Sequence, residues 1–128
     1  MMNGLMNDEP ARRDNPLRTK SFRFAINIVK LYKELIGQQE FALSKQMVRS
    51  GTSIGANIHE AQRAQSIADF TAKMYIALKE AQETEYWLML LKETDYIDHS
   101  TADAAIKDCE ELIKMLTATT KKTAERNY

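Results

Sequence analysis

The chain has 128 residues, enough for one domain with a substantial core. Lysine and arginine together number 18, as do aspartate and glutamate, and this neutral balance argues against indiscriminate binding to nucleic acid. Both prolines, Pro10 and Pro16, lie near the start, and strong helix formers such as alanine, leucine and glutamate fill the remainder. The composition therefore predicts an all-α protein.

The first 16 residues are polar and have no apolar periodicity, which predicts a flexible N-terminal tail over 1–16 and a folded domain over 17–128. The first helix is expected to begin at about Thr19 and to stop at Gly37. Its apolar residues recur every three or four positions, as one buried face requires. The predicted buried stripe comprises Phe22, Ala25, Ile26, Val29, Tyr32 and Ile36, widened by Ile28, Leu31 and Leu35.

The second helix is expected to open at Phe41 or Ser44 and to run to about Arg63. Within it, Gly51 and Gly55 are spaced as in helices that pack closely against a neighbour. Its predicted buried residues are Met47, Gly51, Ile54, Ile58 and Ala61.

Ser66 occupies an N-cap position with Asp69 three residues later, so a third helix is expected from Ile67 to about Glu93. Its predicted buried stripe is Phe70, Met74, Ala77, Ala81, Thr84, Leu88 and Leu91.

Ser100, with Asp103 three residues later, predicts the cap of a fourth helix that frays from Lys121 to Tyr128. Four helices joined by short loops predict an antiparallel, up-down-up-down four-helix bundle. The fourth helix is expected to bury Ala102, Ala105, Ile106, Cys109, Leu112, Ile113 and Leu116.

The segment YWLMLL at 86–91 is apolar in every direction around the third helix. The bundle core can cover Leu88 and Leu91, but Tyr86, Trp87 and Leu90 need a different cover. Exposed Trp and Leu in one patch are typical of an interface. We therefore expect a homo-oligomer with Tyr86, Trp87 and Leu90 at the subunit contacts. The alternative is a monomer in which the N-terminal tail folds back over them.

Charge is unevenly distributed along the chain. Residues 1–64 carry ten Lys/Arg and six Asp/Glu, whereas residues 65–128 carry eight and twelve. This asymmetry favours either self-association by charge complementarity or a basic face that binds a polyanion, and a solvated mixed surface is the alternative. The candidate face for RNA, DNA or another partner comprises Arg18, Lys20, Arg23, Lys30, Lys33, Lys45, Arg49 and Arg63.

Polar residues recur at helical spacing along one face of the second helix and one face of the third. They are Asn57 and Glu60 on the second helix and Lys73, Glu80 and Glu83 on the third. They indicate either an interhelical polar network that fixes the helix register or a charged groove for a partner.

No motif for catalysis is recognisable in the sequence. The chain lacks the Glu-x-x-His pairs of di-metal bundles, the ligand spacing of zinc sites, a glycine-rich phosphate loop and a nucleophile paired with a base. We therefore expect no enzyme activity, catalytic residue, cofactor, metal or small-molecule substrate. The single cysteine, Cys109, is expected to be a buried core residue of the fourth helix.

Hydropathy gives no sign of a membrane segment. No apolar run approaches the about 20 residues that span a bilayer, and residues 1–16 lack the apolar segment of a signal peptide. We expect a soluble, cytoplasmic protein with no membrane partner.

The stretch from Arg49 to Ile97 resembles the four-helix-bundle family of proteins encoded in 23S rRNA intervening sequences. The resemblance implies a small antiparallel bundle that assembles into a homopentamer and has no established catalytic activity. A related branch, the accessory protein of diversity-generating retroelements, forms a similar ring and contacts nucleic acid and a reverse transcriptase. The matching residues are Arg49, Ser53, Ile54, Asn57, Ile58, Glu60, Ala61, Arg63, Ser66, Phe70, Ala77, Glu80, Glu83, Glu85, Leu88 and Tyr96.

The relatives in that branch are strongly basic, whereas this chain is neutral. The sequence and the resemblance together therefore predict a homopentameric interaction scaffold without enzyme activity. The alternative is an RNA- or DNA-binding accessory protein that uses the basic face of the first two helices.

Overall fold

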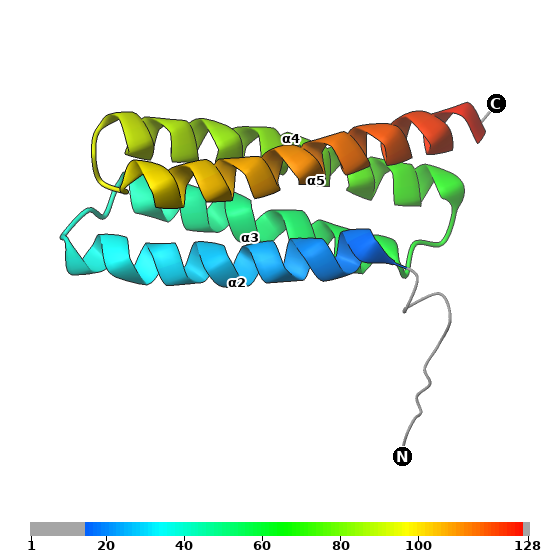
Figure 1. Ribbon diagram of the computed structural model, residues 1–128. Coiled ribbons are helices and arrows are strands. Elements are labelled where there is room, and N and C mark those ends of the chain that lie inside the picture. Colours follow the sequence, from blue (N-terminus) through cyan, green and yellow to red (C-terminus); the bar gives the residue numbers. More distant parts are fainter. Residues whose placement is uncertain (1–14, 127–128) are drawn as a thin grey trace, which may run out of the picture.

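A computed structural model describes residues 15–126, which form four antiparallel helices and no strand (Figure 1). The helices are α2 (Pro16–Gly37), α3 (Leu43–Ala61), α4 (Ile67–Glu93) and α5 (His99–Arg126). Each helix packs chiefly on its sequence neighbours, and α2 meets α5 less extensively to close the bundle. In Figure 1, α2 and α3 form the lower layer, and α4 and α5 form the upper layer. The predicted all-α, up-down-up-down bundle is confirmed.

The first helix begins earlier than the expected Thr19. The side chain of Asn15 accepts a hydrogen bond from the Arg18 N–H at 3.2 Å and caps the helix, and Pro16 is the first helical residue. Proline suits this position because the first helical N–H groups have no acceptor within the helix. Pro16 therefore belongs to the bundle, and the part of the predicted tail over residues 1–14 lies outside the described residues.

The predicted main stripe of α2 is wrong: three of its six residues are exposed and the others, Ala25, Tyr32 and Ile36, are half-buried, whereas the residues expected only to widen it are buried. Phe22 is 67% exposed, Ile26 is 41% exposed and Val29 is 37% exposed. The helix is apolar over so wide an arc that two adjacent stripes compete for the core, and the bundle takes only one of them. The buried residues are Leu17, Ser21, Phe24, Ile28, Leu31 and Leu35.

The first helix ends at Gly37, as predicted, but the left-handed residues that follow α2 and α4 are not glycines. Gly37 does not adopt a left-handed conformation; instead Gln39 does, with φ of 66°, and the Glu40 N–H donates to the Leu35 carbonyl at 2.9 Å. The end of α4 repeats this geometry at Asp95, with φ of 64°. In both turns the backbone satisfies a carbonyl of the last helical turn, as a Schellman motif does.

Carboxylates cap the starts of α3 and α5. Glu40 accepts hydrogen bonds from three backbone N–H groups, of Ala42 at 3.2 Å, Leu43 at 2.9 Å and Ser44 at 2.6 Å. Burial raises the pKa of Glu40, but these hydrogen bonds outweigh it and hold the pKa below its usual value. Glu40 lies before the predicted second helix, and its carboxylate satisfies N–H groups of the first turn of α3.

The predicted cap of α5 at Ser100 is wrong by two residues. Asp98 caps the helix instead, because its carboxylate accepts from the Thr101 N–H at 2.9 Å and from the Thr101 hydroxyl at 2.8 Å. The same bonds lower the pKa of Asp98. The predicted cap of α4 is confirmed, since the Ser66 hydroxyl accepts from the Asp69 N–H at 3.0 Å.

The core predicted for α3 and α4 is confirmed apart from Phe70, which is half-buried against it. In α5, Ala102, Cys109, Leu112 and Leu116 are buried, and the other predicted residues are half-buried against the core. The core is not purely apolar. The hydroxyls of Ser50 and Thr84 are hydrogen-bonded at 2.8 Å between α3 and α4, so neither is left unsatisfied.

The glycines of α3 permit the close approach of α2 that their spacing predicts. A Cβ on Gly51 would lie 2.8 Å from Ile28 Cγ2, and a Cβ on Gly55 would lie 3.3 Å from the Ser21 carbonyl oxygen. Ile28 is fully buried and occupies the space that a side chain at position 51 would fill.

Replacing Gly51 by alanine should therefore lower the free energy of unfolding by about 1–3 kcal/mol, because the added methyl overpacks a filled site. Gly37→Ala is the matched control: nothing lies within 4 Å of its added Cβ, so stability should be unchanged or slightly higher. Denaturant unfolding measures both. Equal stability of the two variants would show that α2 shifts freely on α3.

Candidate interaction surfaces

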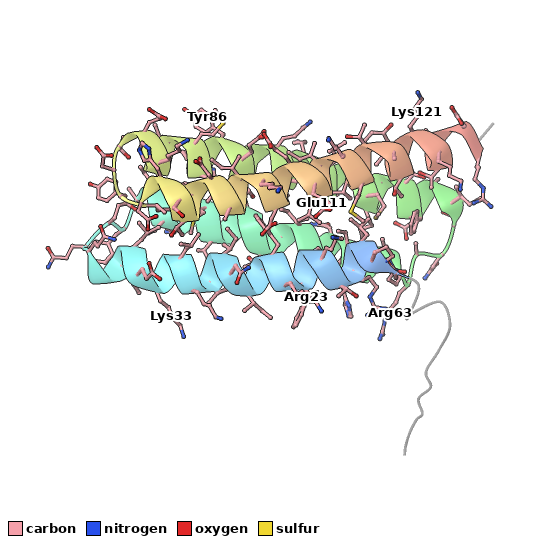
Figure 2. The ribbon with its side chains drawn as sticks, viewed as in Figure 1. Arg23, Lys33, Arg63, Tyr86, Glu111 and Lys121 are labelled. Carbon is pink, nitrogen blue, oxygen red and sulfur yellow. The ribbon has the colours of Figure 1, made fainter. Side chains whose placement is uncertain are left out.

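The outward face of α4 carries a group of large apolar side chains. Tyr86 is 58% exposed, Met89 is 51% exposed and Tyr75 is 48% exposed, whereas Trp87 and Leu90 are half-buried. Figure 2 shows Tyr86 pointing away from the bundle on the α4 side. We call Tyr75, Tyr86, Met89 and Leu90 the α4 face. Residues 86–91, which were predicted to have more apolar side chains than the core can bury, thus contribute to an exposed apolar surface.

Trp87 is held within the protomer rather than presented outward. Its indole N–H donates to Glu83 Oε2 at 3.1 Å, and the same oxygen accepts from Arg49 Nη2 at 2.8 Å. The Tyr86 ring meets the indole edge to face at a centroid distance of 5.1 Å. Glu83 therefore links Trp87 on α4 to Arg49 on α3, and Trp87 packs against Tyr86.

The predicted basic residues divide into paired and unpaired groups. Lys20 forms an ion pair with Glu111 at 3.1 Å, and Arg18 Nη2 lies 3.4 Å from His59 Nδ1. Arg49 is paired with Glu83. Figure 2 shows Arg23, Lys33 and Arg63 along the lower side of the molecule, opposite Tyr86. Within residues 15–126, no ion pair involves the basic residues Arg23, Lys30, Lys33, Lys45 and Arg63.

The exposed apolar residues of α2 form a second surface that the sequence interpretation assigned to the core. Phe22, Ile26 and Val29 follow one another at helical spacing, and we call them the α2 stripe. Beside Phe22, a groove runs between α2 and α3 over Ala25, Thr52, Gly55 and Ala56, with Arg18 and His59 also in its lining. The small residues of α3 leave this groove open.

The five residues of the predicted polar network do not form one network. Glu83 reaches another helix, through Arg49, whereas Lys73 pairs with Asp69 of its own helix at 3.6 Å. Asn57 donates to the Ser53 carbonyl one turn back. Glu60 is exposed on α3, and a buried oxygen of Glu80 has no hydrogen-bond partner within the described residues.

Net charge differs between the two layers of the bundle. Residues 15–64, which include α2 and α3, carry eight basic and three acidic residues, whereas residues 65–126 carry eight and twelve. Acidic groups even adjoin one another on α4 and α5: burial raises the pKa of Glu85, and a hydrogen bond and repulsion from Glu110 raise it further. One layer is therefore positive and the other is negative.

Reactive groups are sparse in the described part of the chain. Cys109 is fully buried and its thiol donates to the Ala81 carbonyl at 3.1 Å. Burial, together with the nearby carboxylates of Glu85 and Glu110, raises the pKa of the Cys109 thiol to about 12. Across residues 15–126, no three His, Cys, Asp or Glu side chains gather as metal ligands. None of the helices in this range is long and apolar enough to cross a membrane.

The sequence profile of the 23S rRNA-intervening sequence protein family matches residues 13–118. The chain belongs to this family. The match extends beyond Arg49–Ile97, where the sequence resemblance is most specific, to all of α2 and most of α5. No curated protein matches this chain.

A crystal structure of a protein of unknown function from the S23 ribosomal protein family of Bacteroides thetaiotaomicron has the same fold. It is 54% identical to this chain, with a TM-score of 0.81, and the similarity covers 82% of this chain and 98% of that one. The predicted family is thus confirmed, and the structural relative has no known function.

Cys109 provides a test of the packing between α4 and α5. Because its pKa is about 12 and it is buried, we expect almost no reaction with a thiol reagent at pH 8 under native conditions. Labelling should become rapid in denaturant, which is the positive control. Rapid labelling of the folded protein, followed by absorbance, would contradict the tight packing of the thiol.

Proposed function

We propose that this family member is a cytoplasmic, homo-oligomeric scaffold without enzyme activity, with five copies as the favoured stoichiometry. The observation that carries the proposal is the α4 face, where large apolar side chains lie exposed beside half-buried Trp87. Tyrosine and tryptophan are the residues that most often anchor protein interfaces. The resemblance of the sequence to pentamer-forming relatives favours a ring of five.

Covering the α4 face would contribute favourable free energy to a repeated contact. An aromatic side chain buries about 150–250 Å² when fully covered, which corresponds to several kcal/mol at about 25 cal/mol per Å². Tyr86 has 58% of its surface exposed, so covering it provides a large part of that stabilisation. The Glu83–Trp87 hydrogen bond fixes the aromatic platform before association, which reduces the entropy lost on binding.

The chemistry of the described residues supports a role without catalysis. The Cys109 thiol is buried and protonated at neutral pH. His59 lies beside the Arg18 guanidinium, and His99 lies 3.7 Å from Asp95 on the surface. No described hydrogen bond joins either histidine to a serine, threonine or cysteine, so neither histidine activates a nucleophile among residues 15–126.

Binding of RNA or DNA is the second candidate function. It is favoured by the five basic residues of α2, α3 and the following turn that form no ion pair within residues 15–126. A single copy offers a small positive patch, but a ring would repeat the patch and raise the affinity by avidity.

Replacing Tyr86 by glutamate should shift the assembly toward single protomers, because a charge at the centre of the α4 face cannot be buried without a partner. Thr117→Glu, at an exposed position on α5, is the matched control and should keep the wild-type mass. Light scattering on a sizing column measures the mass, and circular dichroism confirms that both variants remain helical. A monomeric wild-type protein would contradict the scaffold proposal.

If the second function holds, a fluorescent RNA or DNA duplex should bind with an affinity that falls steeply as salt rises. The double variant Lys45→Glu/Arg63→Glu, at exposed positions outside the α2 stripe, should then weaken binding and flatten the dependence on salt, because fewer counterions are released. Lys114→Glu on α5 is the charge-matched control. Fluorescence anisotropy measures all three proteins, and undetectable or salt-independent binding would count against this function.

A further inference from the structure

We infer that the α4 face of one copy docks on the α2 stripe of the next copy, so that the subunit contact joins two different surfaces. This inference rests on the proposed homo-oligomer and specifies what the α4 face meets. The partner surface is Phe22, Ile26 and Val29, together with the adjoining groove between α2 and α3.

The α2 stripe needs a cover as much as the α4 face does. Phe22, at 67% exposure, is the most exposed large apolar side chain in residues 15–126. The stripe continues into the groove, where Ala25, Gly55 and Ala56 provide an apolar floor. The α4 face supplies protruding aromatic rings, Tyr75 and Tyr86, of the kind that such a groove receives.

The positions of the two surfaces favour a contact that repeats from copy to copy. The helix α2 packs on α3 and α5, with no extensive contact to α4. The labelled side chains of α2 and α4 accordingly point to opposite sides of the molecule in Figure 2. A contact between two different surfaces leaves one of each kind free at the ends, so it adds further copies and closes a ring where the rotation between copies permits.

Charge favours this pairing over a contact between two α2 stripes. Arg23, Ile26 and Lys30 lie along one line of α2, and Lys33 follows Val29 on the stripe itself. Two α2 stripes placed together would bring these cations against one another. A contact between two α4 faces would leave the α2 stripe exposed. The mixed contact covers both apolar surfaces in one interface and sets the positive layer against the negative layer, with Lys79 as the one cation between Tyr75 and Tyr86 on the α4 face.

The test uses two full-length variants, each altered on one surface. Ile26→Glu disrupts the α2 stripe and Tyr86→Glu disrupts the α4 face, and both change exposed positions. Each variant alone should have the mass of one protomer. Mixed in equal amounts, they should form a complex of two protomers and nothing larger, because a single intact contact remains. Sedimentation velocity over a range of concentrations measures these masses.

Other outcomes overturn the inference without affecting the proposed oligomer. If Ile26→Glu assembles like the wild type, the α2 stripe is not part of the contact. If both variants are monomeric and their mixture is also monomeric, the two surfaces do not meet each other. A monomeric wild type would instead overturn the proposed oligomer itself. Phe22→Glu provides a second variant of the stripe, and retained helicity verifies the fold of each protein.

Discussion

The seating of Ile28 against Gly51 fixes how α2 is rotated in the bundle. Without a side chain at position 51, α3 offers a hollow that a buried isoleucine fills at contact distance. A second close approach, of Gly55 to the Ser21 backbone, brings the two helices together over a further turn. This rotation buries one apolar stripe of α2 and leaves Phe22, Ile26 and Val29 facing solvent. The surface available for a partner is thus a consequence of packing at two glycines.

The buried residues of α3 and α4 could be predicted from the sequence because each of these helices has only one apolar stripe that can face the core. In α3 the apolar and small residues form one stripe, and in α4 the Ser66 cap and the buried stripe agree. The first helix lacked such a restriction. Its apolar arc is wide enough for two rotations, and the choice between them depends on Gly51, which lies on another helix.

The helix ends show a different limit. Glycine and serine are the usual signals for a stop and a cap, yet Gln39 adopts the left-handed turn and Asp98 caps α5. Glu40 caps α3 with its longer side chain, although glutamate is uncommon in this role. Each of these choices depends on hydrogen bonds that form only once the loop is closed, so residue type alone could not reveal them.

The candidate surfaces were harder to predict than the fold because they consist of the apolar side chains that stay exposed after the core has formed. Trp87 illustrates this. Because α4 is apolar on all sides near Trp87, the sequence predicts this residue at a subunit contact. In the structure Glu83 and Arg49 hold Trp87 within the protomer, and Tyr86 is the side chain that points outward. The two candidate functions also share a surface. Arg23, Lys30 and Lys33 lie on or beside the α2 stripe, so a subunit contact there would withdraw them from a polyanion. Lys45 and Arg63, on α3 and the turn after it, would then be the basic groups left for nucleic acid, and assembly through α2 therefore competes with nucleic-acid binding for the same cations.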